Sequence, residues 1–191
     1  MEQSLLKTCL MDHRSSVDLN VYQYKADVRL PSIPVTDPFK EENANGVHLG
    51  LYLWDGRNAL WESNKINLEG VAIWVLNPWS EVYGKVFVYT GLNNSLTLID
   101  TGITVVPDTD WHQFELLVDF GTQKYISISV DGVLVDISNV NVAKIYRPNW
   151  GNEVATMITA ESNSTWPFYD CSYVFTWKTQ FTNIEFSYYN P

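Results

Sequence analysis

Two side chains that can carry protons lie on one predicted strand of this 191-residue chain. His48 and Tyr52 are four residues apart in a stretch from Val47 to Trp54 in which core-type and other side chains alternate. A histidine and a tyrosine can act as base and acid in proton transfer. Four residues along a strand place them roughly 13 Å apart, too far for one proton relay unless a neighbouring strand supplies a further group.

A second candidate for chemistry is the sequence Asp108-Thr109-Asp110, which is similar to the start of a calcium loop. It lacks the further oxygen ligands and the glycine of an EF-hand loop. Two interpretations stay open: a calcium site at Asp108 and Asp110, or a turn with solvated carboxylates. The three histidines of the chain are not spaced as a metal cluster, and no other cofactor motif is present.

Aromatic residues are the most informative feature, since the chain has eight Trp and eleven Tyr. Four of the tryptophans stand beside turn residues: Trp54, Trp79, Trp150 and Trp166. Aromatic walls with a few well-placed polar groups are typical of ligand sites. The forked guanidinium group of Arg147 could hold hydroxyls or a sugar carboxylate. The alternative is that these tryptophans cap the ends of the core, half-buried.

Strand signals run along nearly the whole chain, and we expect ten to twelve short strands in two packed antiparallel sheets. Asp131-Gly132 lies between two alternating runs and predicts a hairpin with a type I′ turn. The stretch Val154 to Ala160 is ambiguous between helix and strand. We expect one domain over 1–191, with 1–16 irregular. The main predicted strands are 21–30 (ended by Pro31), 47–54, 71–76, 85–90, 96–99, 111–120, 125–130, 133–137, 173–178 and 181–189.

One block resembles a hairpin of the concanavalin A-like lectin and glucanase jelly rolls, which include laminin G-like and pentraxin-like domains. It consists of Trp111-His112-Gln113-Phe114-Glu115-Leu116, then Asp119, then Tyr125 to Val130, then Asp131-Gly132-Val133-Leu134-Val135. Phe181 to Phe186 is similar to the closing strand of those domains, and Gly46 to Leu53 to an early strand. The resemblance implies a jelly-roll β-sandwich with a glycan site on a concave sheet face or its rim loops.

The catalytic patterns of that superfamily are missing. Its retaining glucanases carry a Glu-x-Asp-x-x-Glu strand, which sets two carboxylates about 5–5.5 Å apart. No Glu of this chain is followed two residues later by Asp, and an Arg-Glu-rich strand and a Gln-x-His strand typical of lyases are absent. The resemblance therefore favours binding over cleavage.

Composition excludes several other classes. The net charge of −10 would oppose binding to nucleic acid, and it argues against an acidic polysaccharide as the main partner. An aromatic content of 14% excludes disorder, and no apolar run is long enough to span a membrane. Residues 1–16 contain no signal peptide. Cys9 and Cys171 are either two free thiols or one bridge, which would imply an oxidising compartment.

These observations together predict a carbohydrate-binding, lectin-like β-sandwich that does not cleave its glycan, with an extracellular or cell-surface role. His48, Tyr52 and Trp54 would line the concave side, and Trp79, Arg147 and Trp150 would contribute from rim loops. No cofactor is expected apart from the calcium alternative. Two other functions stay open: a polysaccharide lyase or glycoside hydrolase with divergent catalytic residues, and a structural or adhesion module.

Overall fold

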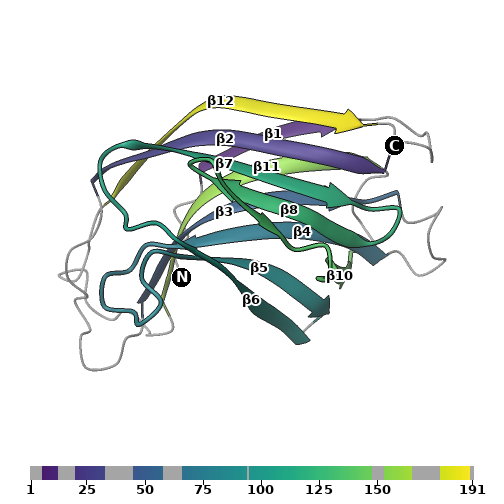
Figure 1. The fold of residues 1–191 in the computed structure, drawn as a ribbon, viewed down its shortest axis with the longest axis horizontal. Coiled ribbons are helices and arrows are strands. Elements are labelled where there is room, and N and C mark those ends of the chain that lie inside the picture. Colours follow the sequence, from purple (N-terminus) through teal and green to yellow (C-terminus); the bar gives the residue numbers. More distant parts are fainter. Residues whose placement is uncertain are drawn as a thin grey trace.

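The computed structural model describes residues 6–12, 20–32, 45–57, 66–93, 95–147, 153–164 and 177–189. Every regular element in these ranges is a strand, and twelve strands form two sheets that stack on each other (Figure 1). This confirms the predicted all-β, two-sheet antiparallel β-sandwich. In this part of the chain, no helix is long and apolar enough to cross a membrane.

The larger sheet has seven strands and the smaller has five. The seven-stranded sheet has the order β1 (Leu6–Asp12), β11 (Val154–Ser164), β3 (Asn45–Asp55), β4 (Ile66–Val75), β10 (Ala143–Tyr146), β5 (Lys85–Leu92) and β6 (Ser95–Thr104). The five-stranded sheet has the order β12 (Lys178–Tyr189), β2 (Val21–Ser32), β7 (Trp111–Asp119), β8 (Lys124–Val130) and β9 (Val133–Asp136). All pairings are antiparallel except one parallel contact, in which Lys144 of β10 pairs with Leu92 of β5.

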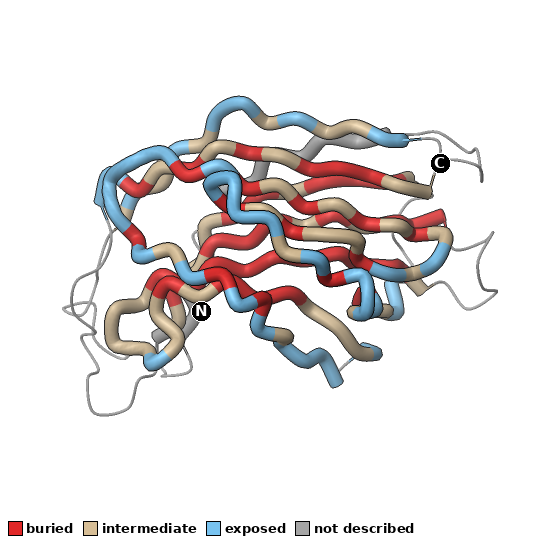
Figure 2. The backbone as a smooth tube through the Cα atoms, viewed as in Figure 1, coloured by how far each residue is buried: buried red, intermediate tan, exposed pale blue. Residues whose placement is uncertain are grey.

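The core lies between the sheets and is built by simple alternation. One face of β2 and one face of β3 are buried completely or almost completely. Figure 2 shows that buried residues are concentrated in the central strands. Because successive side chains of a strand point to opposite faces, β2 and β3 each give one side to the core. The central strand β4 is buried on both faces from residue 67 to residue 75. The buried residues of these two strands are Tyr22, Tyr24, Ala26, Val28 and Leu30, and Val47, Leu49, Leu51 and Leu53.

Three predicted boundaries differ from the structure. β2 continues through Pro31 to Ser32, because its ladder with β7 has ended at Arg29 and a proline there need not donate to β7. The ambiguous stretch from Val154 is the strand β11, which pairs with β3 along its whole length. Residues 6–12, inside the segment expected to be irregular, form β1 and pair with β11.

Two other predictions concern local features. Asp131 and Gly132 both have positive φ, 51° and 80°, and Val130 pairs with Val133 across them, so the predicted β8–β9 hairpin is confirmed. Both alternatives for Cys9 and Cys171, free thiols or one bridge, stay predictions, because Cys171 lies outside the described residues.

A tyrosine from the five-stranded sheet fills a fork in the seven-stranded sheet. β4 pairs with β10 over Ile66–Glu69 and with β5 over 72–74, so the strands diverge between these segments. The Tyr125 hydroxyl enters there, accepting a hydrogen bond from Val71 N at 2.9 Å and donating one to Tyr89 O at 2.7 Å. Burial raises the pKa of Tyr125, so the hydroxyl stays protonated.

Removing this buried hydroxyl tests whether it stabilises the point at which β4 and its neighbours diverge. Tyr125→Phe leaves Val71 N–H and Tyr89 C=O without their partner, and we expect a loss of about 1–3 kcal/mol in the free energy of unfolding. Urea unfolding measures the loss. Tyr146→Phe, at a residue that is 56% exposed, serves as the matched control and should change the midpoint very little. An unchanged midpoint in Tyr125→Phe would contradict a supporting role for the hydroxyl.

Candidate functional site

The candidate site is the outer face of the seven-stranded sheet, the side that points away from the core. A side chain at Gly70 would meet Val118 of the other sheet at 2.7 Å, so the even-numbered residues of β4 point inward and the odd-numbered residues outward. Register then places the remaining members of the face. They are His48, Gly50, Tyr52 and Trp54 of β3, Asn67, Glu69, Val71, Ile73 and Val75 of β4, Phe87 and Tyr89 of β5, and Met157, Thr159 and Glu161 of β11.

Glu161 links the two proton-carrying residues of β3. Its Oε1 accepts hydrogen bonds from the Tyr52 hydroxyl at 3.0 Å and from Thr159 Oγ1 at 2.6 Å. Its Oε2 lies 3.3 Å from His48 Nε2, and His48 and Glu161 are direct partners across the β3–β11 ladder. The neighbouring strand therefore supplies the group that a relay between His48 and Tyr52 requires.

Gly50 allows this arrangement because it has no side chain. A Cβ at Gly50 would lie 2.4 Å from Cε2 of Tyr52, so the Tyr52 ring lies across the glycine and along the strand. This tilt brings the hydroxyl toward Glu161, which is paired with His48 at the far side of Gly50. The short sequence His48-Leu49-Gly50-Leu51-Tyr52 thus sets the geometry of the cluster.

The cluster fixes the charge of its members. Burial raises the pKa of Glu161, but hydrogen bonds from His48, Thr159 and Tyr52 outweigh it and lower the pKa to about 2. Burial, followed by the negative charge of Glu161, raises the pKa of Tyr52. At neutral pH the face therefore presents an ionised carboxylate beside a protonated phenol.

Apolar residues occupy the middle of the face. Val71, Ile73, Val75 and Phe87 form a second hydrophobic cluster, separate from the main core, against which Tyr52, Val82 and Tyr89 pack half-buried. Beyond them, Leu98 of β6 pairs with Tyr89 and is 46% exposed. The face therefore changes from a charged end at Glu161 to an apolar surface at β6.

The other polar group on this face lies near Glu69. Its Oε1 is 3.7 Å from Arg147 Nε, and Trp54, half-buried, is its partner across the β3–β4 ladder. Burial raises the pKa of Glu69 to about 6, although Arg147 acts in the opposite direction. Six residues of β3 separate the partners of Glu69 and Glu161, so the carboxylates are roughly 20 Å apart. Glycoside hydrolysis needs about 5–9.5 Å, so these two cannot form its catalytic pair.

The structure brings four of the six proposed glycan-binding residues to one face: His48, Tyr52, Trp54 and Arg147. Trp79 packs half-buried against the main core, as the capping interpretation expects. Trp150 lies outside the described residues. The sequence pattern indicated no role for Glu161 and Thr159, although both alternate with the core residue Ile158 on β11.

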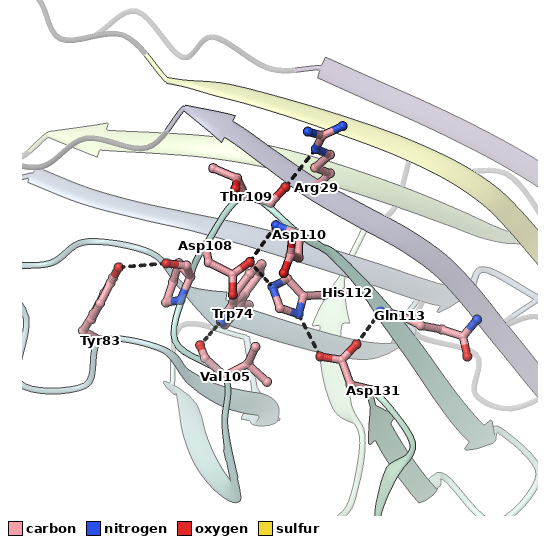
Figure 3. Close-up of polar contacts among 11 residues, drawn as sticks. Arg29, Trp74, Tyr83, Val105, Asp108, Thr109, Asp110, His112, Gln113 and Asp131 are labelled. Carbon is pink, nitrogen blue, oxygen red and sulfur yellow. Dashed lines mark hydrogen bonds and ion pairs between the residues drawn. The ribbon is translucent and has the colours of Figure 1, made fainter.

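The proposed calcium residues take part in a hydrogen-bonded turn. Asp108 Oδ1 accepts from Asp110 N at 2.7 Å and lies 3.2 Å from His112 Nε2, while Asp131 Oδ2 lies 2.7 Å from His112 Nδ1 (Figure 3). The Trp74 ring meets the His112 ring edge-on. Among the described residues, no group of three or more His, Cys, Asp or Glu side chains is arranged to hold a metal ion. A calcium site at Asp108 and Asp110 stays a prediction.

Comparison with known proteins gives likenesses of fold. No family model matches the chain, and no curated protein matches it. Alginate lyase A1-II′ is 10% identical with a TM-score of 0.45, over 95% of this chain and 71% of the lyase. The kappa-carrageenase from Pseudoalteromonas carrageenovora is 13% identical (TM-score 0.44; 90% of this chain and 64% of that chain). Scytalido-glutamic peptidase is 13% identical with a TM-score of 0.43, over 98% of this chain and 81% of the peptidase. These likenesses assign no activity to this chain.

The low pKa of Glu161 predicts a pH-dependent contribution to stability. A carboxyl group whose pKa falls from 4.5 to about 2 on folding stabilises the folded state by up to about 3 kcal/mol above pH 4.5. That contribution is lost as the pH falls from 4.5 toward 2. We expect Glu161→Gln to be less stable than the wild type at neutral pH, with a difference that shrinks on acidification.

Urea unfolding at a series of pH values measures this difference. Glu81→Gln, at an exposed carboxylate, is the control and should follow the wild type throughout. A Glu161→Gln variant that stays parallel to the wild type at every pH would rule out the stabilised carboxylate.

Proposed function

We propose that this protein binds a neutral saccharide on the outer face of the seven-stranded sheet. The observation that carries the proposal is the ionised carboxylate of Glu161, held between His48 and Tyr52 at the edge of a buried apolar cluster, with the half-buried rings of Tyr52 and Tyr89 beside it. A carboxylate orients sugar hydroxyls through strong charge-assisted hydrogen bonds. Aromatic and apolar walls beside a few placed polar groups are the usual composition of a ligand site.

Glu161 retains the capacity to accept a hydrogen bond from a ligand. A carboxylate offers about four acceptor positions. Tyr52 and Thr159 occupy two positions on Oε1, and His48 approaches Oε2. A position on Oε2 is left for a sugar hydroxyl, and the side chains of His48 and Glu161 remain 16% and 14% exposed.

Charge favours a neutral glycan over an acidic one. The face carries the ionised Glu161 at one end, and at the other end Arg147 lies against Glu69. The whole chain has a net charge of −10, so an anionic polymer would approach against long-range repulsion. A neutral sugar meets no such barrier.

A glycan array tests the proposal, followed by titration of the best neutral ligand. We expect Tyr52→Phe to bind about tenfold more weakly, because the variant loses the hydrogen bond that orients Glu161. Trp111→Ala removes a 45% exposed aromatic residue from the other sheet and is the matched control, with unchanged binding. An array without any bound glycan, together with self-association of the protein, would support the assembly-module alternative instead.

The array also tests the calcium interpretation. We expect the same binding profile with calcium and with a chelator, because Asp108 already serves the turn through Asp110 N and His112. A profile that depends on calcium in the wild type, and no longer does so in Asp110→Asn, would overturn this expectation and support the calcium site.

A second candidate function is supported by the same cluster. His48, Glu161 and Tyr52 form a connected set of groups that can hold and transfer protons, which a polysaccharide-cleaving enzyme requires. Assays for reducing ends and for unsaturated products distinguish the two functions. Turnover that is abolished by Tyr52→Phe or by Glu161→Gln would replace the binding interpretation with the catalytic one.

A further inference from the structure

The far end of the outer face contains polar atoms without hydrogen-bond partners. Asn67 is fully buried, and neither its Oδ1 nor its Nδ2 has a hydrogen-bond partner among the residues that the structure describes. In the same described part of the chain, Glu69 Oε1 accepts no hydrogen bond, and Arg147 Nε lies 3.7 Å from it. A buried amide without partners destabilises the fold, so stability does not explain why Asn67 stands at this position.

The orientation of Asn67 points to the outer face. Its neighbours Leu68 and Gly70 face the core, so Asn67 lies on the opposite side of β4, two residues before Glu69. Asn67 pairs with Ile145 of β10, and Arg147 follows two residues later on the same side. Because Arg147 Nε reaches back to Glu69, its side chain runs past the Asn67–Ile145 pair.

We propose that Asn67, Glu69 and Arg147, beside the ring of Trp54, form a second saccharide subsite that opens when the Arg147 side chain moves aside. This inference rests on the proposed function, because the subsite lies on the same face as His48 and Glu161. The Arg147 side chain can change its position because it is long and 43% exposed.

The chemistry of the subsite selects a hydroxyl. The Asn67 amide needs one partner that accepts and one that donates, and a sugar hydroxyl does both. Glu69 Oε1 also needs a donor, which a hydroxyl supplies and an anionic group does not. Arg147 can donate to an acceptor oxygen of the ligand, but only a group that also donates satisfies Glu69 Oε1, so the subsite takes a neutral, hydroxyl-bearing sugar unit.

The spacing defines the length of the ligand. The subsite lies opposite Trp54 and the first cluster lies opposite His48, six residues and roughly 20 Å along β3. No monosaccharide spans that distance, so a chain of several sugar units is required to occupy both ends. Val71 and Ile73 of β4 lie between the two ends and are buried, so the half-buried Tyr52 ring packed against them is the group on this stretch that a ligand can reach.

The test measures binding of neutral cello- and manno-oligosaccharides, from the disaccharide to the hexasaccharide, by calorimetry. We expect the affinity of the wild type to rise with ligand length. In Asn67→Leu the hexasaccharide should bind about tenfold more weakly, whereas the disaccharide should bind as before. Arg147→Lys, which keeps the charge but not the fork, should show the same selective loss and guards against a folding defect in the first variant.

Thermal unfolding gives a readout that does not depend on a ligand. Because Leu removes the buried amide without leaving a void, we expect Asn67→Leu to raise the melting temperature by about 2–4 °C. Thr156→Val is the matched control: the Thr156 hydroxyl is also buried without a partner, but it faces the core beside Val154 and Ile158. It should raise stability and leave all binding unchanged.

The outcomes separate the subsite from the function on which it rests. If the wild type binds none of the oligosaccharides, both the proposed function and the subsite are overturned. If the wild type binds them but Asn67→Leu and Arg147→Lys keep the same length dependence, only the subsite is overturned. A fall in the melting temperature of Asn67→Leu would show that Asn67 is a structural residue and would overturn the subsite as well.

Discussion

The register between β3 and β11 is the constraint on which the site depends. It places Glu161 opposite His48, and Gly50 opposite Thr159, so that the Tyr52 ring can cross the glycine and reach the same carboxylate. The core enforces this register, because a slip of one residue would turn Leu49, Leu51 and Leu53 outward and His48 and Tyr52 inward. The packing that stabilises the sandwich therefore also assembles the polar cluster on its outer side.

The two carboxylates of the face show how environment separates groups of the same kind. Glu161 has three hydrogen-bonding neighbours, which outweigh its burial and keep it ionised. Glu69 has one cation at 3.7 Å, too little to offset burial, and its pKa rises to about 6. One end of the face therefore offers a fixed negative charge, and the other offers a carboxyl group that is readily neutralised. This difference fits a ligand that donates hydrogen bonds at both ends and carries no charge.

The sequence predicted the parts of the fold that alternation and turn chemistry determine. The core faces of β2 and β3 and the Asp131-Gly132 hairpin follow from residues close together in the chain. β11 was ambiguous because its Ala, Thr and Met residues favour neither state, and its pairing with β3 and β1 decides the outcome. The role of Glu161 also depends on strand pairing, because its contact with Tyr52 joins residues 109 positions apart, and local sequence does not indicate it.

Contrast between the two outer faces indicates where the ligand binds. On the outer face of the five-stranded sheet several polar side chains bond to one another: Gln23 bonds with Glu115 and Tyr189, and Asp27 accepts from Gln113 and Asn183. On the seven-stranded sheet, Asn67 and one oxygen of Glu69 lack such partners among the residues described. A chain that could satisfy one face could have satisfied the other, and buried polar groups left without partners cost stability. Such local conflicts in natural proteins are found mainly where function requires them, so the unsatisfied face is the one we assign to the saccharide.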